Sequence, residues 1–152
     1  MCGIAGLVSS KEPAKTATVQ VMIDSIKHRG PDDEGVYTQE EVGLGQRRLS
    51  ILDVSAKGHQ PMRFGNRYVM TFNGEIYNYL ELKKELPDIK YESASDSEVL
   101  MHAYATWGPD CVKKFNGIFA FAIWDEKERT LFAARDHVGV KPFYYATAGE
   151  TT

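Results

Sequence analysis

The segment at residues 117–124 constrains the fold of this chain more than any other. It reads Gly-Ile-Phe-Ala-Phe-Ala-Ile-Trp, whereas a strand with one face in water alternates polar and apolar residues. A strand that is apolar on both faces must be covered on both faces. The polar residues 125–129 predict a turn, after which residues 130–134 return as a hairpin partner. The chain therefore requires more than two layers of secondary structure.

The other predicted elements are helices grouped between short strands. Apolar residues at helical spacing predict a helix over residues 13–28, and the S-x-x-E capping box at Ser95 begins another that Gly108-Pro109 ends. Shorter helices are predicted at 77–86 and 110–115. Strands are predicted at 4–8, 35–38, 42–46, 68–72 and 143–147, with a loop at 55–67. This order predicts an α+β fold with mostly antiparallel sheets.

Length and charge narrow the function classes. A chain of 152 residues with 43% hydrophobic residues suits one domain. The net charge of −3 and the absence of a dense Lys/Arg run argue against a nucleic-acid or membrane surface. The two cysteines lie far apart, and the four histidines show no metal-ligand spacing. We therefore expect a cytoplasmic protein with no metal site.

Cys2 directly follows the initiator Met1. Removal of Met1 would place a thiol and a free α-amine on one residue, which supplies a nucleophile and its base together. Taken alone, a free cysteine is more often a small buried hydrophobic residue. Likewise, Asn73-Gly74 alone predicts a hairpin turn. Asp96 alone is explained by the helix dipole, which favours acidic residues near a helix N-terminus. Each feature separately leaves its structural alternative open.

The combination of these features predicts a specific chemistry. The Asn73 amide and the Gly74 N–H form a suitable pair of oxyanion donors, because glycine permits close backbone approach. Arg48 can bind a carboxylate, and Glu75 and Asp96 can bind an ammonium. Together with the Cys2 thiol and amine, these groups fit hydrolysis of the side-chain amide of free glutamine.

Ordered sequence blocks along almost the whole chain carry a family resemblance. They are Met1-Cys2-Gly3-Ile4-Ala5-Gly6, His28-Arg29-Gly30-Pro31-Asp32, Arg48-Leu49-Ser50-Ile51-Leu52-Asp53, Asn73-Gly74-Glu75-Ile76-Tyr77-Asn78, Ser95-Asp96, Phe119-Ala120-Phe121-Ala122 and Arg135-Asp136-His137-Val138-Gly139-Val140-Lys141-Pro142. With these blocks, the chain resembles the glutaminase domain of class II glutamine amidotransferases. The third block favours the asparagine synthetase branch of that family.

The resemblance implies an N-terminal-nucleophile hydrolase fold, an αββα sandwich, over residues 2–152. It implies that Cys2 attacks the glutamine amide, that its α-amine shuttles the proton, and that Asn73 and Gly74 stabilise the oxyanion. Substrate-binding roles are implied for Arg48, Leu49, Ser50, Ile51, Leu52, Asn73, Gly74, Glu75 and Asp96. The glutaminase step would need no cofactor and no metal.

The resemblance also sets expectations about what lies beyond this sequence. Domains of the family continue with further strands after the equivalent of Tyr144-Tyr145, and then join a synthetase domain that uses ATP and Mg²⁺ and carries an SGGxDS loop. We therefore expect a domain whose last strands are missing, with a partner synthetase domain or subunit. Whether the chain forms a homodimer is left open.

Three functions follow from these expectations. The first is glutamine hydrolysis that supplies ammonia for asparagine synthesis from aspartate. The second is a non-catalytic glutamine-binding or regulatory partner of a separate synthetase. The third is an amidotransferase that feeds a different acceptor, such as a sugar or a peptide carboxylate.

Overall fold

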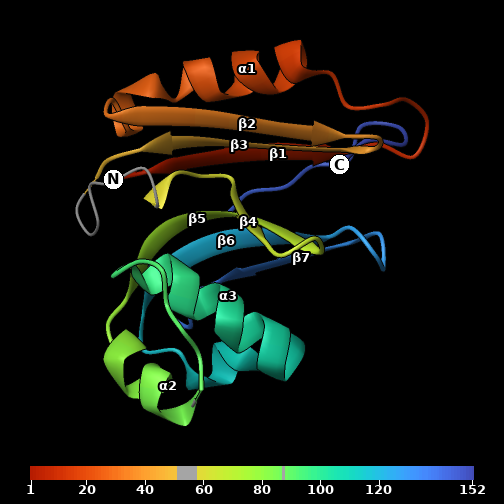
Figure 1. The fold of residues 1–152 in the computed structure, drawn as a ribbon. Coiled ribbons are helices and arrows are strands. Elements are labelled where there is room, and N and C mark those ends of the chain that lie inside the picture. Colours follow the sequence, from red (N-terminus) through yellow and green to blue (C-terminus); the bar gives the residue numbers. More distant parts are fainter. Residues whose placement is uncertain (51–57, 87) are drawn as a thin grey trace.

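The computed structural model describes residues 1–50, 58–86 and 88–152, and its elements form four layers (Figure 1). Helix α1 (Thr16–Ser25) covers a three-stranded sheet of order β1-β3-β2, and a four-stranded sheet of order β4-β5-β6-β7 packs beneath it. Helices α2 (Tyr79–Glu85) and α3 (Asp96–Trp107) cover the far side. All strand pairs are antiparallel. The predicted αββα sandwich is confirmed.

The first sheet holds the N-terminus against its central strand. Strand β3 (Val42–Arg48) is buried along its whole length between β1 (Gly3–Val8) and β2 (Asp33–Gln39). Helix α1 lies close to β3, because a Cβ at Gly45 would come within 2.4 Å of the Ile23 side chain. The β1–β3 register pairs Gly3 with Arg47. Cys2 therefore lies next to the end of β3, where Arg48 is the last strand residue.

The second sheet contains the strand that was predicted to be covered on both faces. Strand β6 (Gly117–Asp125) is buried from its third residue onward, between β5 (Tyr68–Ile76) and β7 (Thr130–Arg135). Phe119 and Phe121 pack in the core under the helices, whereas Ala122 and Trp124 pack toward the first sheet. The two-sided pattern thus correctly predicted its place between two layers.

Three local predictions differ from the structure. A short strand, β4 (Met62–Phe64), pairs with β5 inside the segment predicted to be a loop. Asn73-Gly74 is not a turn, because β6 pairs with β5 through both residues. Residues 143–147 form no strand. At the end of the edge strand β1, the backbone of Val8 pairs instead with Thr152.

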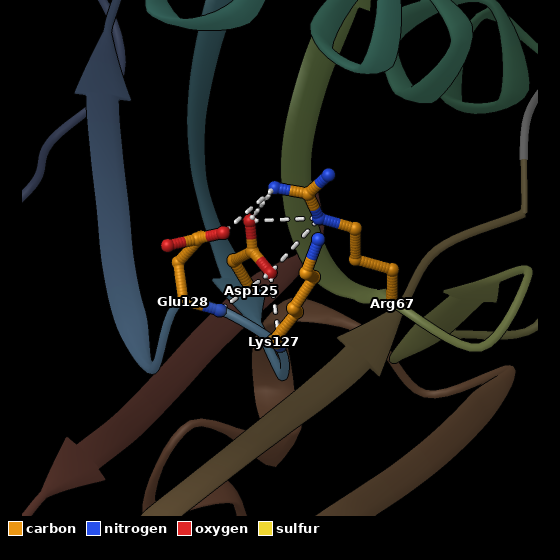
Figure 2. A network of polar contacts seen from close by, with 4 residues as sticks. All are labelled: Arg67, Asp125, Lys127 and Glu128. Carbon is orange, nitrogen blue, oxygen red and sulfur yellow. Dashed lines mark hydrogen bonds and ion pairs between the residues drawn. The ribbon is translucent and has the colours of Figure 1, made fainter.

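A polar network joins two turns at one end of the second sheet (Figure 2). The Arg67 guanidinium, which precedes β5, donates to both oxygens of Asp125 at the end of β6, at 2.7 to 3.1 Å. The backbone N–H groups of Lys127 and Glu128 donate to the same carboxylate. Burial alone would raise the pKa of Asp125, but these donors lower it below its usual value. The network therefore depends on the ionised carboxylate.

Asp125→Asn should destabilise the fold by about 1.5–3 kcal/mol at pH 7, because it removes charge-assisted hydrogen bonds from a buried group. The pKa of Asp125 is lowered in the fold, so its contribution is present above the unfolded-state pKa and is lost as the pH falls through the folded-state pKa. Urea denaturation at pH 7 and in acid measures the free energy of unfolding. The difference between the variant and the unsubstituted chain should be smaller in acid than at pH 7. Glu128→Gln, at a side chain 58% exposed, is the control. An equal difference at both pH values would contradict this account.

Candidate active site

Cys2 is half-buried and held from two sides at the start of β1. The Leu49 N–H donates to Cys2 Sγ at 3.5 Å, and the thiol lies 3.7 Å from the Leu49 carbonyl oxygen. Arg29 Nε donates to the Cys2 carbonyl oxygen at 3.0 Å. The second Arg29 nitrogen, Nη2, is buried with no hydrogen-bond partner in the part of the chain that the structure describes. The thiol is thus fixed beside the residue that follows Arg48.

The alternation of β5 decides which of its side chains face Cys2. Thr71 Oγ1 donates to the Gly45 carbonyl oxygen of the first sheet at 3.1 Å. Side chains two residues apart point to the same face of a strand, so Asn73 and Glu75 share that face. Phe72, by contrast, packs in the core under the helices. Strand β5 therefore presents its polar side chains toward the sheet that carries Cys2.

The backbone of β5 presents one further donor on the edge away from β6. The Phe72 N–H donates to Gln60 Oε1 at 2.7 Å, and the Ile76 N–H donates to Asp96 Oδ2 at 2.8 Å. Alternate N–H groups of a strand point to the same edge. The N–H of Gly74, which lies between these two residues, therefore also points away from β6. Gly74 borders the cavity described next, so this N–H is available to a ligand.

One cavity of about 70 Å³, called here the Cys2 cavity, collects most of the predicted site residues. Those that line it are Cys2, Arg48, Leu49, Asn73, Gly74, Glu75 and Asp96. Ser50 is not among them, and its N–H donates to Asp32 Oδ2 at 2.8 Å. Ile51 and Leu52 lie outside the described residues. A nucleophile, amide and backbone donors, a cation and two carboxylates thus meet in one place.

Both carboxyl groups in the Cys2 cavity have raised pKa values. Burial raises the pKa of Glu75, the charge of Asp96 raises it further, and Lys141 lowers it. Burial also raises the pKa of Asp96, against the hydrogen bonds from the backbone N–H groups of Ile76 and Ser97. A cationic ligand group beside them would oppose these shifts and favour the ionised form of both carboxyl groups.

Several cavity residues were not predicted from the sequence. Gln60 lies in the segment predicted to be a loop, and Ser97 follows Asp96 in α3; Gln60 Nε2 lies 3.5 Å from Ser97 Oγ. Lys141 belongs to a sequence block that carried the resemblance, but no role was assigned to it. No periodicity marks these residues, because they reach the cavity through irregular segments and a helix start.

A second, larger hollow of about 850 Å³ lies along β1 and the C-terminal segment. Its lining is mainly apolar and includes Phe143 and Tyr144. It does not include Cys2 or the two carboxylates, so it lacks the groups needed for amide hydrolysis. We therefore place the candidate active site in the smaller Cys2 cavity.

Within residues 1–50, 58–86 and 88–152, no cluster of three or more His, Cys, Asp or Glu side chains could hold a metal ion. None of the helices in these ranges has the length and apolar content needed to cross a membrane.

Gln60→Leu should destabilise the protein by about 1–3 kcal/mol, because it leaves the buried Phe72 N–H without its acceptor. Urea denaturation gives the free energy, and amide hydrogen exchange should show faster exchange at Phe72. Gln20→Leu is the control, because the Gln20 amide donates to Asp24 on an exposed helix face. Equal stability of the two variants would show that the Gln60 contact is dispensable.

Comparison with known proteins identifies relatives over the whole chain. The family profile described as a glutamine amidotransferase domain matches residues 1–152. Asparagine synthetase [glutamine-hydrolyzing] 3 of Bacillus subtilis (strain 168) is 46% identical over 158 residues, which is 99% of this chain and 26% of the relative. Putative asparagine synthetase [glutamine-hydrolyzing] 2 of Methanocaldococcus jannaschii is 43% identical over 95% of this chain and 32% of the relative. The chain thus spans about a quarter to a third of the length of these relatives.

A solved structure shares the fold. Glutamine phosphoribosylpyrophosphate amidotransferase from B. subtilis matches 99% of this chain and 40% of its own chain, with a TM-score of 0.82 and 17% sequence identity. At that identity, the match concerns the fold alone. Together with the family profile and the relatives of 43% and 46% identity, it confirms the predicted resemblance: the chain belongs to the glutamine amidotransferase domain family.

Proposed function

We propose that this chain hydrolyses L-glutamine to L-glutamate and ammonia, with Cys2 as the nucleophile after Met1 is removed. The main support is the Cys2 cavity, where the thiol, the Gly74 N–H and Asn73 meet one arginine and two carboxylates. Residues 2–152 would act as one glutaminase domain. The relatives named as glutamine-hydrolysing asparagine synthetases support the same reaction.

Substrate recognition in this proposal divides between one cation and two carboxylates. Arg48, only 7% exposed, binds the α-carboxylate of glutamine. Glu75 and Asp96, which line the same cavity, bind the α-ammonium. Backbone groups at Leu49, and in the proposal those of Ser50, Ile51 and Leu52, complete the pocket. The side-chain amide is then directed toward Cys2.

The proposed chemistry is acyl transfer to sulfur followed by hydrolysis. The α-amine takes the thiol proton, and Sγ adds to the amide carbon of glutamine. The Asn73 amide and the Gly74 N–H bind the resulting oxyanion. The α-ammonium returns its proton to the leaving nitrogen, so ammonia departs and a thioester remains. Water, deprotonated by the same amine, then releases glutamate and restores the thiol.

The released ammonia would serve asparagine synthesis from aspartate. This step rests on the names of the relatives, because the chain spans only about a quarter to a third of their length. In this proposal a synthetase domain or subunit with an SGGxDS loop is the partner. That partner, and not the glutaminase domain, would use ATP and Mg²⁺.

Asn73→Ala should lower the rate of glutamine hydrolysis by about 100- to 1000-fold, because it removes one oxyanion donor. Glutamate release from the processed chain, with mass spectrometry confirming the loss of Met1, measures the effect. Asn66→Ala, at an exposed residue before β5, is the matched control and should keep full activity.

The unsubstituted chain separates the alternatives in the same assay. Calorimetric binding of glutamine without glutamate release would favour the non-catalytic partner function. Failure both to release glutamate and to react at Cys2 with an electrophilic glutamine analogue would refute the proposed function.

A chain that retains Met1 should fold but hydrolyse no glutamine, because the Cys2 nitrogen is then an amide and cannot accept the thiol proton. Met1 also lines the Cys2 cavity and reduces the space for substrate. An uncleaved N-terminal extension tests this, with circular dichroism as the check on folding. Full activity of the extended chain would show that the α-amine is not the base.

A further inference from the structure

Lys141 is a buried cation in the Cys2 cavity to which the proposed mechanism gives no role. Its exposed fraction is 5%, and it lines the cavity together with Glu75 and Asp96. The charge of Lys141 lowers the pKa of Glu75, so the two side chains lie close to each other. Lys141 is thus held among the charges that would bind glutamine.

The backbone of Lys141 is anchored to the strand that pairs with the oxyanion donor. Asp136 accepts hydrogen bonds from the backbone N–H groups of Phe119, Val140 and Lys141, at 2.8 to 3.3 Å. The Asp136 N–H also donates to the Phe119 carbonyl oxygen at 2.7 Å. Phe119 is the β6 residue paired with Gly74. The segment that carries Lys141 is therefore fixed relative to the cavity wall.

The Lys141 ammonium makes a weak contact that would not survive processing. Its Nζ lies 2.8 Å from the sulfur of Met1, and a thioether is a poor acceptor for a charged donor. Removal of Met1 takes this contact away. The ammonium then remains in the cavity with Glu75 and Asp96 as the nearby acidic groups.

When Glu75 and Asp96 both bind the substrate ammonium as carboxylates, Lys141 supplies a second positive charge beside them. Arg48 would neutralise the substrate carboxylate, which leaves two negative charges on Glu75 and Asp96. The substrate ammonium neutralises one of them. A second negative charge without compensation is costly in a small buried site. Asp96 is already stabilised by the Ile76 N–H, whereas Glu75 has Lys141 as the cation acting on it.

We propose that Lys141 is a positioning residue, a fixed counter-charge that lets Glu75 and Asp96 hold the substrate ammonium together. This inference rests on the proposed function, since it concerns the ammonium subsite for glutamine. The groups that face Glu75 are Asp96 from α3, Lys141 from the segment after β7, and Arg48 and Cys2 from the first sheet. Lys141 acts through Glu75 and does not touch the reacting amide.

The test measures glutamine affinity by calorimetry from pH 5 to pH 8, in chains that carry Cys2→Ala and have lost Met1, so that no turnover occurs. Burial and Asp96 raise the pKa of Glu75, and Lys141 opposes them. Lys141→Met should therefore move the loss of affinity in acid to higher pH by about one unit. At pH 6 we expect about tenfold weaker binding, with little change at pH 8.

Three controls distinguish this effect from loss of structure. Lys141→Arg keeps the charge and should restore the original pH profile. Lys113→Met, at a side chain 75% exposed, should leave the profile unchanged. The glutamine analogue without the α-amino group, 4-carbamoylbutanoate, should show no such shift with Lys141→Met. If Lys141→Met does not fold by circular dichroism, Lys141→Gln takes its place.

Each outcome decides between the two proposals. Equal pH profiles for the lysine and the neutral variants would overturn the role of Lys141 and leave glutamine binding intact. An equal shift for the analogue without the amino group would also overturn it. By contrast, if the chain that keeps Lys141 binds no glutamine at any pH, the proposed function is overturned.

Discussion

The pairing of β5 with β6 through Asn73 and Gly74 is the constraint on which the site depends. Because the ladder continues past these residues, Asn73 faces Cys2 and the Gly74 N–H points away from β6. A turn at this point would send both groups in other directions. Only glycine fits, since a Cβ on Gly74 would lie 2.2 Å from the Ile118 carbonyl oxygen. Strand pairing and the proposed oxyanion binding thus place the same requirement on this position.

The sequence predicts the fold well where an apolar pattern is long. It predicts the structure poorly where a residue's conformation depends on the strand with which it pairs. The eight-residue apolar run at 117–124 predicted a strand between two layers, because a strand buried on both faces has no alternating polar residues. Asn73-Gly74 has the local preference of a hairpin turn, but its partner on β6 overrides that preference. Residues 143–147 have strand-like composition, but they form no strand, because composition alone does not determine which backbone groups pair.

Site residues that stand in short sequence motifs could be predicted, whereas those that reach the cavity from irregular segments could not. Cys2 and Asn73-Gly74 stand in recognisable blocks, and the structure brings them into one cavity. Gln60 and Lys141 enter the same cavity from irregular segments, where neither period nor spacing marks a residue. Their contributions come from contacts between segments far apart in the sequence. Gln60 satisfies the Phe72 N–H, and Asp136 anchors the Lys141 segment to β6.

Met1 connects the two proposals in one physical step. While it is present, its sulfur lies on the Lys141 ammonium and its peptide bond removes the basicity of the Cys2 nitrogen. Its removal creates the base and, at the same time, leaves Lys141 to face the acid pair. The base and the ammonium subsite would therefore become competent together. A chain that kept Met1 would lack both functions, even though every other group of the Cys2 cavity were in place.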